Sequence, residues 1–170
     1  DFFEDNLIDP DQPKELIIER GITEIEPDAF RECNSLKKVT LPDGLETIGP
    51  RAFQGCQNLD YIEIPDTVTY LGREAFLLCS KLKYVKLSKG LKSISGAAFE
   101  NCASLESICI PEGVETIHRY AFNFCGRLKM IMIPNSLKDI NPMVSYAFPV
   151  KLVAMDDNPV IEEAVKSKQG

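Results

Sequence analysis

One spacing dominates this sequence, because five of its six cysteines recur at intervals of 23 residues: Cys33, Cys56, Cys79, Cys102 and Cys125. An Ala-Phe pair precedes each of these cysteines, and a leucine follows each one three residues later. One full repeat reads LETIGPRAFQGCQNLDYIEIPDT. A unit this short cannot bury its apolar face alone, so we expect the repeats to stack around one continuous core.

Each repeat closes with a short run of alternating residues, such as Ile62-Glu63-Ile64, that a proline ends in every complete copy but one. The alternation predicts a strand with one buried face, and proline ends it because proline cannot donate to a ladder. The apolar Ala-Phe-x-x-Cys stretch predicts a helical or 3₁₀ turn on the other side. Stacked copies would form a parallel sheet at ~4.8 Å spacing, in a right-handed coil.

The pattern LxxIxxxAFxxCxxLxxIxLP, found in five consecutive copies over residues 22–136, resembles the BspA-like, Treponema-type leucine-rich repeat family. The resemblance implies an α/β repeat solenoid with a concave parallel sheet of about seven short strands. It also implies a secreted or cell-surface location and a role in attachment and recognition. The family fold brings no catalytic residues that could be carried over.

The chain length fits a single solenoid domain over residues 1–170, closed at both ends. We expect an N-terminal cap at 1–21, six repeats at 22–149 with an irregular last copy at Ala147-Phe148, and a C-terminal cap at 150–170. Glu15 to Ile18 predict a first, atypical strand, and Leu152 to Met155 predict a last one. Asn158 and Pro159 then begin a predicted capping helix.

Composition excludes several classes of partner. The chain is 44% hydrophobic and 26% charged, which is typical of a globular protein. No apolar run is long enough to span a membrane, and the net charge of −7 disfavours nucleic acid. The acidity is concentrated in residues 1–32, so any steering of a basic partner should act at that end. Because the chain begins at Asp1 without an apolar leader, we expect a processed chain or an excised piece.

The cysteine column admits several interpretations. Stacked thiols project in parallel, which is poor geometry for disulfides, and a line of thiols does not converge on zinc. Redox chemistry needs an exposed thiol with a low pKa. We therefore favour small apolar side chains that fill the core. The sixth cysteine, Cys109, lies at an outward strand position, and we expect it to be accessible.

The sequence contains no residue pattern that is typical of an enzyme active site. The single histidine, His118, falls in a repeat turn, where no Ser-His-Asp or Cys-His pair can be assembled around it. The glycines follow the turns and form no phosphate-binding string. We expect no catalytic residue, no metal and no cofactor.

The outward positions of the strands are the best candidates for binding. Two neighbouring columns carry tyrosines, methionines and charges, and an edge column of alternating charge is expected to be structural. The candidate partner-binding residues are Lys38, Tyr61, Glu63, Tyr84, Lys86, Cys109, Met130 and Met132.

Three functional hypotheses follow. The first is a non-enzymatic recognition or adhesion module that binds a protein or peptide on the concave sheet. The alternative is a structural spacer or scaffold within a larger surface protein. The third and weakest is an enzyme that uses Cys109 as a reactive thiol.

Overall fold

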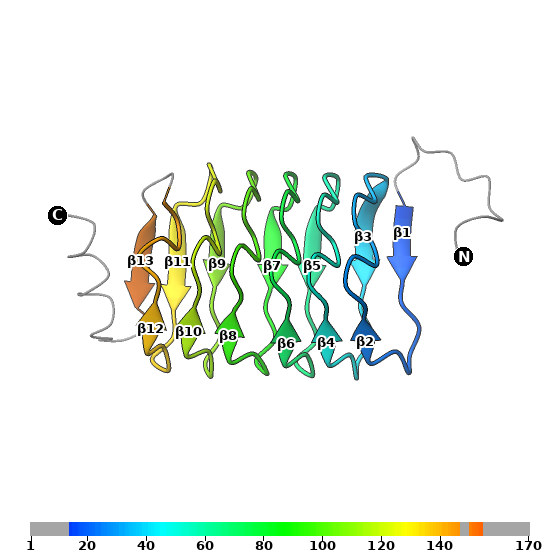
Figure 1. Ribbon diagram of the computed structural model, residues 1–170, viewed down its shortest axis with the longest axis horizontal. Helices are drawn as coiled ribbons and strands as arrows, with labels where there is room; N and C mark the ends of the chain where they lie inside the picture. The colour runs from blue at the N-terminus through cyan, green and yellow to red at the C-terminus, as the bar shows by residue number, and fades with distance from the viewer. Residues whose placement is uncertain (1–13, 147–149, 155–170) are drawn as a thin grey trace.

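The computed structural model describes residues 14–146 and 150–154, which form a stack of coils along one axis (Figure 1). One side of the stack carries the longer strands: β1 (Lys14–Ile17), β3 (Leu36–Thr40), β5 (Tyr61–Glu63), β7 (Tyr84–Lys86), β9 (Ser107–Cys109), β11 (Met130–Ile133) and β13 (Lys151–Ala154). We call this side the long-strand face. All of its strand pairings are parallel, so the predicted parallel sheet and its strand positions are confirmed.

The long-strand face is divided into two hydrogen-bonded sheets, β1-β3-β5-β7 and β9-β11-β13. From Glu15 to Met132, residues paired within each sheet are 23 positions apart, as Tyr61 and Tyr84 are, whereas β13 pairs with β11 at a spacing of 21. The alternation of buried and exposed residues follows the strand period, with Ile62 and Val85 buried between outward-facing neighbours. The sequence period therefore becomes a set of straight columns across the strands.

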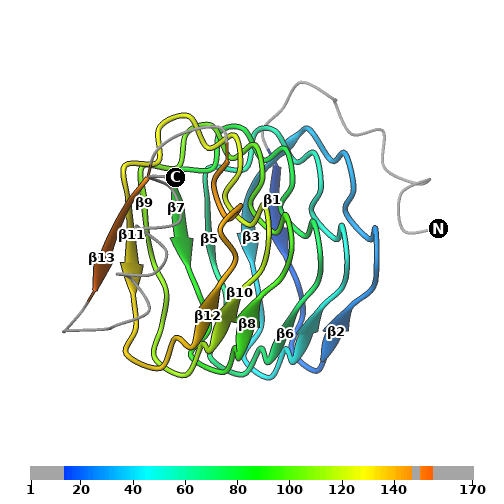
Figure 2. The same ribbon diagram turned by 60° about the vertical axis from the view of Figure 1, so that its left-hand side comes forward.

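A second row of parallel strands lies on another side of each coil (Figure 2). Each strand has only two residues: β2 (Glu24–Ile25), β4 (Thr47–Ile48), β6 (Tyr70–Leu71), β8 (Ser93–Ile94), β10 (Thr116–Ile117) and β12 (Asp139–Ile140). The sequence did not predict this row, because two residues are too short to show an alternating pattern. Pairing with the next coil creates these strands.

The core consists of the same few side chains stacked coil upon coil. Its most regular element is a ladder of phenylalanine rings, with successive centroids 5.2 to 5.7 Å apart and interplanar angles of 2° to 14°. The rings of the ladder belong to Phe30, Phe53, Phe76, Phe99 and Phe122. The four rings from Phe53 onward are fully buried, whereas Phe30 at the first coil is half-buried.

The predicted helical or 3₁₀ turns are wrong, because the described residues contain no helix. In the first full coil, every second backbone N–H from Asp28 to Glu32 donates to a carbonyl of the next coil at 2.7 to 3.0 Å. The intervening N–H groups donate three residues back. Two residues of a coil adopt left-handed conformations, such as Glu74 (φ 61) and Leu78 (φ 64), which a helix of L-residues does not tolerate. Bonds between coils thus replace helical ones.

Several predictions fall outside the described residues: most of the N-terminal cap, the Ala147-Phe148 irregularity and the capping helix that begins at Asn158. The predicted first and last strands are present as β1 and β13, each displaced by one residue. Within the described ranges, no helix has the length and apolar character needed to cross a membrane.

Candidate partner-binding surface

All eight candidate residues lie on the long-strand face, on strands β3 to β11. The register places Lys38 beside Tyr61, Tyr61 beside Tyr84, and Glu63 beside Lys86. Farther along, Cys109 lies beside Met132. The division of the face between β7 and β9 separates these two groups. The candidate residues therefore lie on two adjoining surfaces of different chemistry.

The first surface contains a hollow of about 330 Å³ over β3, β5 and β7. Four of the eight candidate residues line it: Lys38, Tyr61, Glu63 and Lys86. Its other lining residues are Val39, Thr40, Leu41, Asp43, Ile64 and Pro65. Together, these residues include one aromatic ring, two ammonium groups and two carboxylates.

The hollow lies where β3 and β5 part from each other. Their register has a single aligned pair, Lys38 with Tyr61, whereas β5 and β7 align at three positions. Beyond that pair, the hydrogen bond expected from Leu41 N–H to the Glu63 carbonyl is not formed in the described structure. Its equivalents are present in three other coils, at Ile18 to Thr40 (3.0 Å), Ile64 to Lys86 (2.9 Å) and Ile110 to Met132 (2.9 Å). Among the described residues, the equivalent bond from Leu87 to Cys109 is missing as well, at the division between β7 and β9.

The charges of the hollow differ in how they are satisfied. The Lys38 ammonium lies 3.7 Å from a Glu15 carboxylate oxygen. A hydrogen bond with Tyr61 and the charge of Glu15 raise the pKa of Lys38, so this cation already has partners within the fold. By contrast, Glu63, Lys86 and Asp43 are exposed, and none has an ion-pair partner within 4.0 Å among the described residues.

The second surface is formed by Cys109, Met130 and Met132 on β9 and β11. Cys109 is exposed as predicted, and both methionines are half-buried. Partial burial raises the pKa of the Cys109 thiol, which opposes the thiolate form that a nucleophile needs. His118 lies on the exposed turn after β10. Within the described ranges, no three His, Cys, Asp or Glu side chains are grouped so that they could hold a metal.

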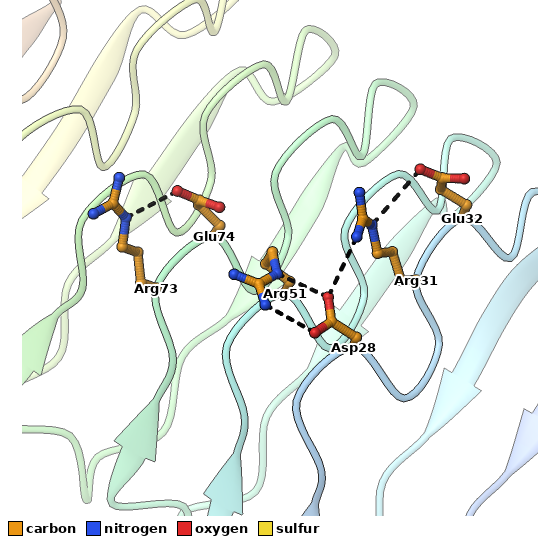
Figure 3. A network of polar contacts seen from close by, with 6 residues as sticks. All are labelled: Asp28, Arg31, Glu32, Arg51, Arg73 and Glu74. Carbon is orange, nitrogen blue, oxygen red and sulfur yellow. Dashed lines mark hydrogen bonds and ion pairs between the residues drawn. The ribbon is translucent and has the colours of Figure 1, made fainter.

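A polar network that the sequence analysis did not identify lies on the turns (Figure 3). Arg51 makes a two-pronged contact with Asp28, at 2.8 and 2.9 Å, which lowers the pKa of that carboxyl group. Arg31 forms ion pairs with Asp28 and with Glu32, and Arg73 forms one with Glu74. Three guanidinium groups are thus balanced by three carboxylates. The alignment of Asp28 with Arg51 at the repeat spacing was the signal that could have found it.

The column of five cysteines has the structural role expected of it, with one addition. Four of its thiols are buried, and each donates a hydrogen bond to the phenylalanine carbonyl of the preceding coil at 3.0 to 3.3 Å. Burial raises the pKa of Cys56 and of Cys125 to about 12. All six cysteines of the chain are free.

Parallel strands stacked at a fixed repeat, with a leucine-rich interior and no helix in the described part, define a leucine-rich repeat solenoid. The family described as BspA type leucine-rich repeat region matches residues 23–152 with six copies. The chain belongs to this family, as the repeat pattern indicated.

Solved structures of bacterial leucine-rich repeat proteins agree with this fold. A Bacteroides ovatus protein is 30% identical, with a TM-score of 0.66 over 85% of this chain and 43% of its own. A Treponema pallidum protein is 23% identical, with a TM-score of 0.69 over 90% and 82%. A Faecalibacterium prausnitzii protein, described as a leucine rich cell surface protein, is 20% identical, with a TM-score of 0.57 over 87% and 61%. The chain thus spans 43% and 61% of the Bacteroides and Faecalibacterium proteins. A search of the curated proteins finds no significant match.

Proposed function

We propose that this chain is a non-enzymatic recognition module that binds a protein or peptide on the long-strand face. The observation that carries the proposal is the hollow of about 330 Å³, because it unites Lys38, Tyr61, Glu63 and Lys86 at one place. A concave site with an aromatic ring and a few polar groups is typical of ligand sites. Tyrosine is also among the residues that contribute most to binding energy at interfaces.

The proposal includes a location at the cell surface or outside the cell. It is supported by membership of the BspA-type family and by the Faecalibacterium prausnitzii protein of the same fold, which is described as a cell surface protein. An adhesion role is compatible with this location, since a stacked array presents one extended face to a partner.

The test uses a library of random peptides displayed on phage and selected on the immobilised chain. The affinity of the best peptide is then measured by calorimetry against the wild-type chain and the double variant Tyr61→Ala/Tyr84→Ala. We expect at least a tenfold loss, because truncating a central aromatic contact typically costs more than ~1 kcal/mol. The matched control is Tyr70→Ala, since Tyr70 is 48% exposed, close to the 52% of Tyr84, but lies on β6 in the other strand row.

An unchanged affinity in the double variant, or a loss confined to Tyr70→Ala, would move the binding site away from the long-strand face. The alternative function, a spacer or scaffold in a larger surface protein, is favoured by one observation. The chain matches only 43% of the Bacteroides ovatus protein. A selection that yields no peptide dependent on the long-strand face would support that alternative.

A further inference from the structure

The hollow holds charges that the fold leaves uncompensated. Opposite charges in neighbouring coils form ion pairs elsewhere on the stack, including Lys83 with Asp60 at 3.2 Å and Lys138 with Glu115 at 2.9 Å. Glu63 and Lys86 are also direct neighbours in register, yet they form no such pair. Both line the hollow and both are exposed. A carboxylate and an ammonium group are therefore available to a ligand side by side.

Two residues that line the hollow also lack a backbone hydrogen bond between their coils. The missing bond between Leu41 N–H and the Glu63 carbonyl leaves one donor and one acceptor without their partners from the adjacent coil. Both residues line the hollow. An extended peptide supplies an N–H and a C=O from nearly every residue, so it can satisfy both kinds of group.

From these observations we propose that the hollow binds an extended peptide with two oppositely charged side chains two residues apart, the acidic one against Lys86 and the basic one against Glu63 and Asp43. This inference rests on the proposed function and names the chemistry of the partner. Side chains at i and i+2 of an extended peptide lie on the same side, roughly 6.6 Å apart. The strands that carry Glu63 and Lys86 lie ~4.8 Å apart, a difference that long charged side chains can span.

The test needs no known ligand, because the same displayed library is selected in parallel on several chains. On the wild-type chain we expect the selected peptides to be enriched at least fivefold in acid-base pairs at i and i+2. On Lys86→Met the acidic member of the pair should lose its enrichment while the basic member keeps it. On the double variant Glu63→Gln/Asp43→Asn the basic member alone should lose its enrichment.

The matched control is Lys83→Met. Lys83 lies just before β7, does not line the hollow and forms an ion pair with Asp60. Its selected peptides should match those of the wild-type chain. All the substituted residues are exposed, and circular dichroism verifies that each variant is folded.

The outcomes separate this inference from the proposed function. Peptides that depend on Tyr61 and Tyr84 but show no charged pair, or a pair that Lys86→Met leaves unchanged, would overturn the inference while the recognition module stands. A selection that yields no peptide, with binding of the chain to arrayed oligosaccharides instead, would overturn both.

Discussion

The thiol of Cys79 donates a hydrogen bond to the backbone carbonyl of Phe53, 3.2 Å away in the preceding coil. The sequence spacing suggested a small apolar side chain at this position, and the structure adds a polar role. The same carbonyl also accepts from the backbone N–H of Cys56 at 3.2 Å, so the thiol is its second hydrogen-bond donor. Each buried cysteine of the column therefore links its coil to the preceding coil by a hydrogen bond.

Replacing this thiol should be costly. We expect Cys79→Ala to lower the free energy of unfolding by about 1 to 3 kcal/mol, since it removes a buried side chain and a hydrogen-bond donor together. The control is Cys109→Ala on the exposed face, which should change stability by less than about 0.5 kcal/mol. Urea unfolding measures both, and equal losses would show that the column contributes no more than an exposed position.

Alkaline pH should destabilise the fold through the same column. The pKa of Cys56 and of Cys125 is about 12 in the folded chain, against an ordinary value of 9.0. Above pH 9 the unfolded thiols ionise while the folded thiols keep their protons, so the unfolded state is favoured. The contribution of these two thiols to the free energy of unfolding should be complete below pH 9 and should be lost as the pH rises toward 12. Unfolding measured from pH 8 to 10.5 should show a smaller decline in Cys56→Ala/Cys125→Ala than in the wild-type chain.

The thiols should also differ in reactivity. With a thiol reagent at pH 8, Cys109 should be modified in the native chain and the half-buried Cys33 more slowly. The four buried cysteines should react only after unfolding, because burial excludes the reagent and raises their pKa. Peptide mapping by mass spectrometry identifies the sites. Rapid native labelling of Cys79 would contradict the closed core.

The phenylalanine ladder predicts a gradient of stability along the stack. Phe76 lies between two parallel rings, at 5.3 and 5.4 Å, and is fully buried. Phe76→Ala should therefore cost about 3 to 5 kcal/mol. Within the described part of the chain, Phe30 has a single ring neighbour, and it is half-buried, so Phe30→Ala should cost about half as much. Similar losses at both positions in urea unfolding would argue against a cooperative core centred on the middle coils.

The left-handed turn residues offer a way to stabilise the chain. Glu32 has a φ of 59° at the column position that Gly55 occupies in the next coil with a φ of 74°. Glu32→Gly should raise stability by up to about 1 kcal/mol, because glycine adopts this conformation without strain. The control is Arg31→Gly, which breaks the same ion pair (Figure 3) at a residue without this conformation and should destabilise. Thermal unfolding compares them, and destabilisation by both would refute the strain argument.

Local sequence patterns predicted the long-strand face well and the turns poorly. Ile62 and Val85 alternate with exposed neighbours, and that alternation alone determines which face of a strand is buried. The turns contain apolar residues at spacings that suit a helix, yet Glu74 and Leu78 are left-handed. Their N–H groups donate to residues of the following coil, at Gly96 and Glu100, which no local pattern can reveal.

The candidate site shows the same division. The sequence by itself determined that Tyr61, Glu63, Tyr84 and Lys86 share one face, because a 23-residue period and a two-residue strand alternation leave no other arrangement. Only the tertiary structure decided that β3 and β5 part after Lys38, that a hollow opens there, and that Cys109 and the methionines lie beyond it. The physical reason is that a repeat specifies which residues stack, whereas the spacing between two coils depends on how every side chain between them packs.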